Sequence, residues 1–163
     1  RNNMAVYVLK WADRGGNGSV AYPDCAGDVV QNRYEADLAA TPLKGVTLAV
    51  GDIIDFGLIP AFSTVTDLLI DSDDLDSNGS PTLAYDVGVL TGTPGDTTGR
   101  TCGTEFFAAT TASQAAGVTR LAKGTGFRIA PVGYDRSIGI KITTAAATQA
   151  TSGLLALALN VKG

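Results

Sequence analysis

The sequence contains no histidine and only two cysteines in its 163 residues. The absence of histidine excludes Ser-His-Asp and Cys-His catalysis, histidine general bases and histidine-ligated zinc. The two cysteines, Cys25 and Cys102, are too few to form a structural zinc site alone. They can pair in a disulfide or stay reduced, as thiols do in proteins assembled in the cytosol. The sequence therefore predicts no metal and no cofactor.

Charged residues are scarce as well. They make up 17% of the chain, whereas an average soluble domain has about 25%. The net charge is −4, which argues against binding to nucleic acid or to anionic membranes. No apolar run approaches the roughly 18 residues of a membrane span. A neutral surface rich in hydroxyl groups is typical of proteins whose faces are covered by other subunits, and also of secreted β-domains.

The part of the chain from residue 46 onward has the pattern of an all-β protein. Apolar residues alternate with small or polar ones in segments 83–89, 138–142 and 155–161, and Gly, Pro and Asn mark the turns between segments. This pattern predicts a β-sandwich or jelly-roll body, residues 46–163, with about six to eight strands. We expect an exposed loop at residues 90–106 and at most one short helix, at residues 106–116.

The first 45 residues differ from the body and predict an extended N-terminal arm with one short strand near residues 4–9. Two interpretations remain open for the aromatic side chains of this segment. They can anchor the chain to another protein or a neighbouring subunit, since Tyr and Trp are favoured at interfaces, or they can pack on the chain's own core. The candidate interface residues are Tyr7, Trp11, Tyr22 and Tyr34.

An acidic segment, residues 71–79, contains four aspartates and ends in Asn-Gly. Its second half fits the start of a calcium loop, but the twelfth position of such a loop, which needs Glu, is Tyr85. A looser cation site and a catalytic carboxylate cluster are further alternatives. We favour a turn between two strands, because Asn-Gly tolerates positive φ and Asp and Ser side chains bind backbone N–H groups.

Carboxylates alone can catalyse glycoside hydrolysis, so three isolated acids, Asp86, Glu105 and Asp135, are considered as well. Nothing in their spacing connects them, and we predict that the protein is not an enzyme.

Charge is also segregated along the chain. No Lys or Arg occurs between Lys44 and Arg100, whereas the segment after Arg100 is mildly basic. The two parts can neutralise each other within one subunit or meet across subunits.

Several segments together resemble small proteins encoded beside the major capsid protein of tailed phages. These segments are residues 52–60, 70–79, 129–131, 135–141 and 143–147, and the resemblance extends over about residues 46–160. Such proteins are head decoration, or cement, proteins, often β-sandwich modules clustered as trimers. No motif of the first 45 residues takes part in the resemblance.

The resemblance implies a structural protein of the phage virion. It implies that the chain binds the outer capsid surface at junctions between major capsid protein subunits, as a homo-trimer, and stabilises the head. An alternative is a head-fibre or carbohydrate-binding module of the virion. Either role implies assembly in the host cytoplasm.

Overall fold

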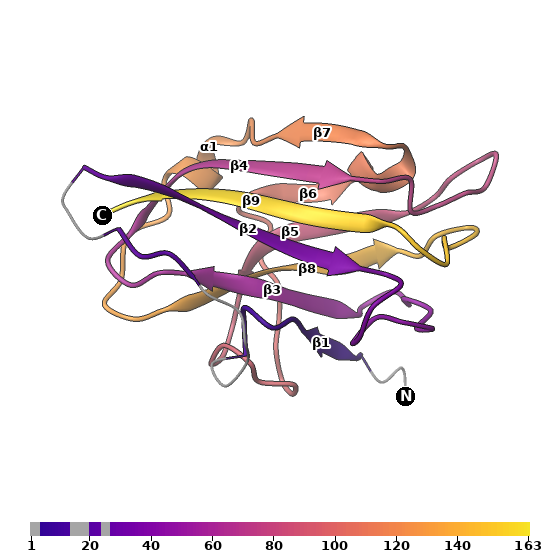
Figure 1. Ribbon diagram of the computed structural model, residues 1–163, viewed down its shortest axis with the longest axis horizontal. Helices are drawn as coiled ribbons and strands as arrows, with labels where there is room; N and C mark the ends of the chain where they lie inside the picture. Colours follow the sequence, from indigo (N-terminus) through magenta and orange to yellow (C-terminus); the bar gives the residue numbers. More distant parts are fainter. Residues whose placement is uncertain (1–3, 14–19, 24–26) are drawn as a thin grey trace.

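The computed structural model describes residues 4–13, 20–23 and 27–163. In this part of the chain two β-sheets pack face to face, which confirms the predicted sandwich (Figure 1). The five-stranded sheet has the order β1-β3-β8-β5-β6 and the four-stranded sheet has the order β2-β9-β4-β7. The strands are β1 (Val6–Val8), β2 (Val29–Asp37), β3 (Ile53–Ile59), β4 (Thr64–Ser72), β5 (Ala84–Leu90), β6 (Phe107–Thr110), β7 (Gly117–Arg120), β8 (Arg136–Thr144) and β9 (Leu154–Lys162).

The core lies between the sheets and is built by the alternating segments that the sequence reveals. Ile138, Ile140 and Ile142 of β8 face it from one sheet. Leu155, Leu157 and Leu159 of β9 face it from the other sheet. Both strands are central and antiparallel to their neighbours, so their side chains alternate between the core and the outer face of each sheet.

The N-terminal segment contributes a strand to each sheet. β1 pairs in parallel with β3, and β2 pairs with β9 in a continuous antiparallel register from Val29 to Asp37. The described parts of residues 1–45 are therefore not separate from the body that was predicted to begin at residue 46. The pairing follows from the pattern of β2, in which Asn32, Tyr34 and Ala36 are buried while the residues between them are exposed. Attachment of this segment to another protein stays a prediction.

The helix expected at residues 106–116 is not formed. Its first half is β6, which pairs with the edge of β5, and Ala112–Gln114 form one turn of 3₁₀-helix. The Phe, Thr and Ser residues of this segment offset the helix preference of its alanines, and the open edge of β5 supplies backbone partners for it. The α-helix of the described chain is α1 (Gly124–Phe127), a single short turn.

Candidate functional site

Tyr34, one of the four predicted interface residues, is completely buried in the sandwich. Its hydroxyl donates a hydrogen bond to the carbonyl oxygen of Leu58 at 2.7 Å. Its ring lies so close to Gly57 that a Cβ atom there would be 2.6 Å from the ring. Burial raises the pKa of Tyr34 far above its usual value. No partner can reach this side chain in the folded protein, so the interpretation of core packing applies to Tyr34.

Trp11 and Tyr7 are half-buried and lie beside the same part of the core. The Trp11 ring is tilted by 57° to the Tyr34 ring, with 6.0 Å between the ring centroids, and Lys10 Nζ lies 4.3 Å from the centre of the Trp11 ring. Trp11 also lines a surface groove of about 290 Å³ with Leu9, Pro42 and Leu154, and with the carboxylates Glu35 and Asp37. Trp11 is thus a wall of an open groove as well as a packing residue.

Tyr22 is exposed, and it belongs to a cluster that we call the aromatic tip, formed by Tyr22, Phe62 and Tyr134. The exposed fractions of these side chains are 45%, 74% and 66%. Asp135 joins the segments of the tip, because its carboxylate accepts hydrogen bonds from the Tyr22 hydroxyl at 3.0 Å and from the Ala61 N–H at 2.9 Å. The Phe62 ring lies against Gly133, next to Tyr134.

Phe62 is also held in an unfavourable backbone conformation. Its φ is 60°, in the left-handed region that non-glycine residues seldom adopt, and its N–H donates to the Val132 carbonyl at 2.7 Å. Such strain concentrates at functional sites. The position of Phe62 in the sequence is the one signal that could have revealed it. Phe62 lies in the turn between β3 and β4, so its side chain belongs to no buried strand face.

The acidic segment lies at the opposite end of the sandwich, where it links β4 of one sheet to β5 of the other (Figure 1). The prediction of a strand-to-strand connection is confirmed, but neither Asn78 nor Gly79 has a positive φ. Asp76 organises the connection instead. Its buried carboxylate accepts hydrogen bonds from four backbone N–H groups at 2.7 to 3.0 Å, those of Thr82, Leu83, Ala147 and Thr148.

These hydrogen bonds determine the chemistry of the acidic segment. Burial opposes ionisation of Asp76, but the four N–H donors outweigh it and hold the pKa of Asp76 well below its usual range. N–H donors surround this carboxylate, whereas a cation site would need further oxygen ligands there. Within the described ranges no group of three or more His, Cys, Asp or Glu side chains is placed to hold a metal.

We expect Asp76→Asn to destabilise the fold. A neutral amide oxygen accepts hydrogen bonds from the backbone N–H groups less strongly than a carboxylate does. The amide NH₂ group is itself a donor and would face backbone N–H donors, so these would lose their acceptor. The depressed pKa makes the stabilisation by wild-type Asp76 present above pH ~4 and lost as the pH falls below it. Thermal unfolding of wild type and variant at pH 7 and at acidic pH measures this pH-dependent stabilisation. The difference in Tm between wild type and variant should be several degrees at pH 7 and should shrink in acid. A difference that does not depend on pH would contradict the assignment.

A buried ion pair lies on the outer face of β3, between Asp55 and Arg100. Both side chains are inaccessible to solvent and in direct contact. Ser137 Oγ also donates to Asp55 at 3.0 Å, and Arg100 Nε donates to the Thr91 carbonyl at 2.8 Å. Burial raises the pKa of Asp55, and Arg100 and the hydrogen bonds partly offset this rise. The pair fastens the loop after β5 to the sheet, while most residues of the loop are exposed, as predicted.

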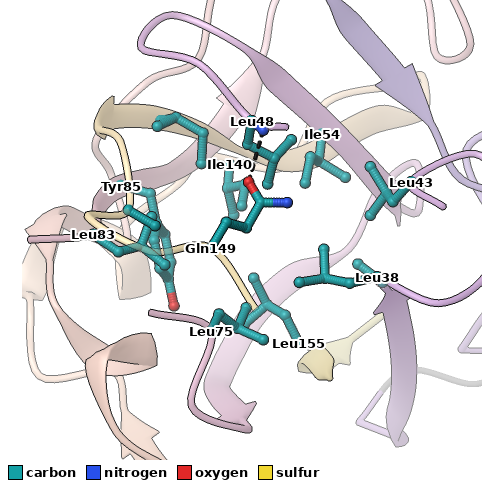
Figure 2. A pocket seen from close by; sticks show the side chains of 13 residues that line it. Leu38, Leu43, Leu48, Ile54, Leu75, Leu83, Tyr85, Ile140, Gln149 and Leu155 are labelled. Carbon is teal, nitrogen blue, oxygen red and sulfur yellow. Dashed lines mark hydrogen bonds between the residues drawn. The ribbon is translucent and has the colours of Figure 1, made fainter. Parts of the chain in front are cut away.

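A small cavity between the sheets is apolar and offers no binding site for a ligand of any size. Its volume is about 20 Å³, close to that of one water-sized probe. Figure 2 shows the Gln149 side chain among the leucine and isoleucine side chains that line it. The Gln149 amide is engaged by backbone groups, since it accepts from the Leu48 N–H at 2.8 Å and donates to the Val46 carbonyl at 2.7 Å. This cavity is a packing feature of the core.

The three isolated acids have structural partners. Asp86 accepts a hydrogen bond from the Ala109 N–H at 2.8 Å, and Glu105 accepts one from the Val89 N–H at 3.0 Å. Asp135 holds the aromatic tip together, as described above. Each carboxylate thus positions a loop or a strand edge.

Cys25 lies outside the described residues, so its pairing with Cys102 stays a prediction. Cys102 is half-buried and forms no disulfide within the described ranges. Burial raises the pKa of its thiol to about 12, with a further contribution from Asp86 and Glu105. A thiol with this pKa is protonated at neutral pH and unreactive.

No helix in the described part of the chain is long and apolar enough to cross a membrane.

The fold and these surfaces define an all-β protein whose exposed features are suited to contacts with other proteins. Comparison with solved structures gives the relationship. A chain of the "Capsid of Ralstonia phage GP4" has 36% sequence identity and a TM-score of 0.85, and the match covers 98% of this chain and 99% of that chain. The chain therefore belongs to the same family as this phage capsid protein, and it is a structural protein of a phage virion.

A second solved structure shares the fold. A chain of the "Cyanophage Pam1 capsid asymmetric unit" has 22% identity and a TM-score of 0.65, with 90% of this chain and 94% of that chain covered. The sequence matches no family model and no curated protein.

Proposed function

We propose that the protein is a capsid decoration protein. It binds the outer surface of the head at junctions between major capsid protein subunits, as a homo-trimer, and stabilises the shell by burying interface area without catalysis. The observation that carries this proposal is the full-length relationship to a chain of the Ralstonia phage GP4 capsid.

The surface of the protein supports a role in contacts between proteins. Three aromatic side chains are exposed at one end, and aromatic residues are enriched in the centres of interfaces. Of the predicted anchors, Tyr7, Trp11 and Tyr22 stay candidates for direct contact with a neighbouring subunit. Tyr34 contributes through the core, because it shapes the surface on which Trp11 packs.

The aromatic tip also favours a second candidate function, a head-fibre or carbohydrate-binding module. Exposed aromatic rings stack on the apolar faces of sugars as well as on protein side chains. Binding of the purified protein to a glycan array distinguishes the two functions. Binding to glycans that Phe62→Asn abolishes would favour the carbohydrate-binding module.

The decoration role is tested by adding the purified protein to phage heads that lack it. We expect saturable binding and an increase in the temperature at which the heads release their DNA, because a ligand that binds only the intact shell stabilises it. The control is the same protein added to isolated major capsid subunits that have not assembled, which lack the junctions. Absence of binding to heads would contradict the proposal.

A further inference from the structure

The charges of the sandwich are separated along its long axis. Among the described residues, the end where β2 and β4 terminate and β5 and β9 begin, the acidic end, carries six carboxylates against three cations. They are Asp37, Asp52, Asp71, Asp73, Asp74 and Asp76 against Lys44, Lys141 and Arg33, which is ion-paired with Asp71. Among the described residues, the end with the aromatic tip carries one cation more than it carries carboxylates, with Lys123, Arg128, Arg136 and Lys162 against Asp28, Glu105 and Asp135. Figure 1 shows these two ends on opposite sides of the molecule.

The two ends also differ in shape. The aromatic tip projects from the turns, with Phe62 as its most exposed residue. The groove of about 290 Å³ extends along β2 toward the acidic end, and apolar side chains of Leu9, Trp11, Pro42 and Leu154 line it. Two carboxylates, Glu35 and Asp37, and one cation, Lys10, border the groove. One molecule thus presents a projecting apolar surface and a recessed one, on parts of the fold with opposite excess charge.

We propose that the chain associates with a second copy of itself head to tail. The aromatic tip of one copy lies in the groove of the next, with Phe62 at the centre of the contact and the mildly basic end of one copy against the acidic end of the other. A contact between two different surfaces leaves one of each free, so further copies can add until a ring closes, and a closed ring of three copies is the homo-trimer. This contact deepens the homo-trimer part of the proposed function and rests on it, but does not depend on binding to the capsid.

The conformation of Phe62 supports this assignment. A phenylalanine with a φ of 60° costs backbone energy, and in the single subunit three quarters of its side chain remain in water. Burial in an interface compensates for both costs. Two hydrogen bonds fix the turn in the single subunit. The Val132 carbonyl accepts one from the Phe62 N–H, and Asp135 accepts the other from the neighbouring Ala61 N–H.

Phe62→Asn tests the tip without disturbing the fold, because asparagine tolerates the left-handed conformation. Ala40→Arg tests the groove, since Ala40 is exposed on its wall and the new side chain fills it. Val118→Asn is the matched control, an exposed apolar residue on β7, which is the edge of the four-stranded sheet opposite to β2 and its groove. Sedimentation velocity of the full chain, at several protein concentrations and at low and high salt, measures the association.

We expect wild type and Val118→Asn to self-associate, more strongly at low salt. Loss of a central aromatic residue weakens association by about 30-fold or more, so Phe62→Asn and Ala40→Arg should be monomers with an unfolding temperature close to that of wild type. A mixture of these two variants should form a dimer and nothing larger, because only one intact tip and one intact groove are available. A monomeric wild type overturns the proposal, as does an oligomer that persists in both variants. Neither result bears on binding to heads.

Discussion

Arg100→Met is expected to destabilise the protein by about 3–5 kcal/mol, because it leaves the Asp55 carboxylate buried without its counter-charge. The ion pair is inaccessible to solvent, so water cannot take the place of the guanidinium. Arg100 also donates to the Thr91 carbonyl, and methionine cannot. Chemical denaturation at neutral pH measures the change, which should appear as a lower midpoint with an unchanged slope.

The matched control is the double variant Asp55→Asn with Arg100→Met. Removing both charges removes the uncompensated carboxylate, so the double variant should recover a large part of the stability that Arg100→Met loses. The amide oxygen introduced by Asp55→Asn would still accept the hydrogen bond from Ser137. If Arg100→Met were as stable as wild type, or if the double variant were no better than the single one, the ion pair would have no structural role.

Tyr34→Ala is the second substitution with a large expected effect, a loss of about 3–5 kcal/mol for deleting a large buried aromatic side chain. Tyr34→Phe should cost about 1–2 kcal/mol, because it leaves the buried Leu58 carbonyl without its hydroxyl partner. Denaturation curves of both variants measure these losses. Tyr22→Ala is the control, since Tyr22 is exposed and its loss should change stability by only about 0.5 kcal/mol.

The same reasoning applies to removal of the N-terminal segment. Deletion of residues 1–40 takes away all of β2 and with it the buried side chains of Tyr34 and Ala36. We expect the truncated chain to lose its cooperative unfolding transition, so that failure to bind heads would say nothing about an anchoring arm. Point substitutions at Tyr7, Trp11 and Tyr22 are the proper test of anchoring. A stable, folded truncation would contradict the structural role of β2.

The alternation of apolar residues with small or polar ones predicted the central strands well. Ile138, Ile140 and Ile142 form one face of β8, and this face is buried as expected. Segment 106–116 was predicted wrongly, because its conformation depends on the edge of β5, more than fifteen residues earlier in the chain. Such non-local pairing leaves little trace in local propensity.

The features of the candidate site were less accessible from the sequence. Arg100 looked like a residue of an exposed loop, since its partner Asp55 lies in a strand far away in the chain. Asp76 stood among four aspartates, and only the backbone N–H groups that converge on it distinguish it from the others. The aromatic tip is assembled from three separate segments, so no local motif announces it.

The most direct test of the decoration role is a cryo-electron microscopy reconstruction of the phage particle that contains this protein. Our proposal predicts density for this sandwich on the outer face of the shell, at junctions between major capsid subunits, in numbers comparable to those of the shell protein itself. Density confined to a fibre or tail, with a few copies per particle, would contradict it, as would a position within the shell lattice.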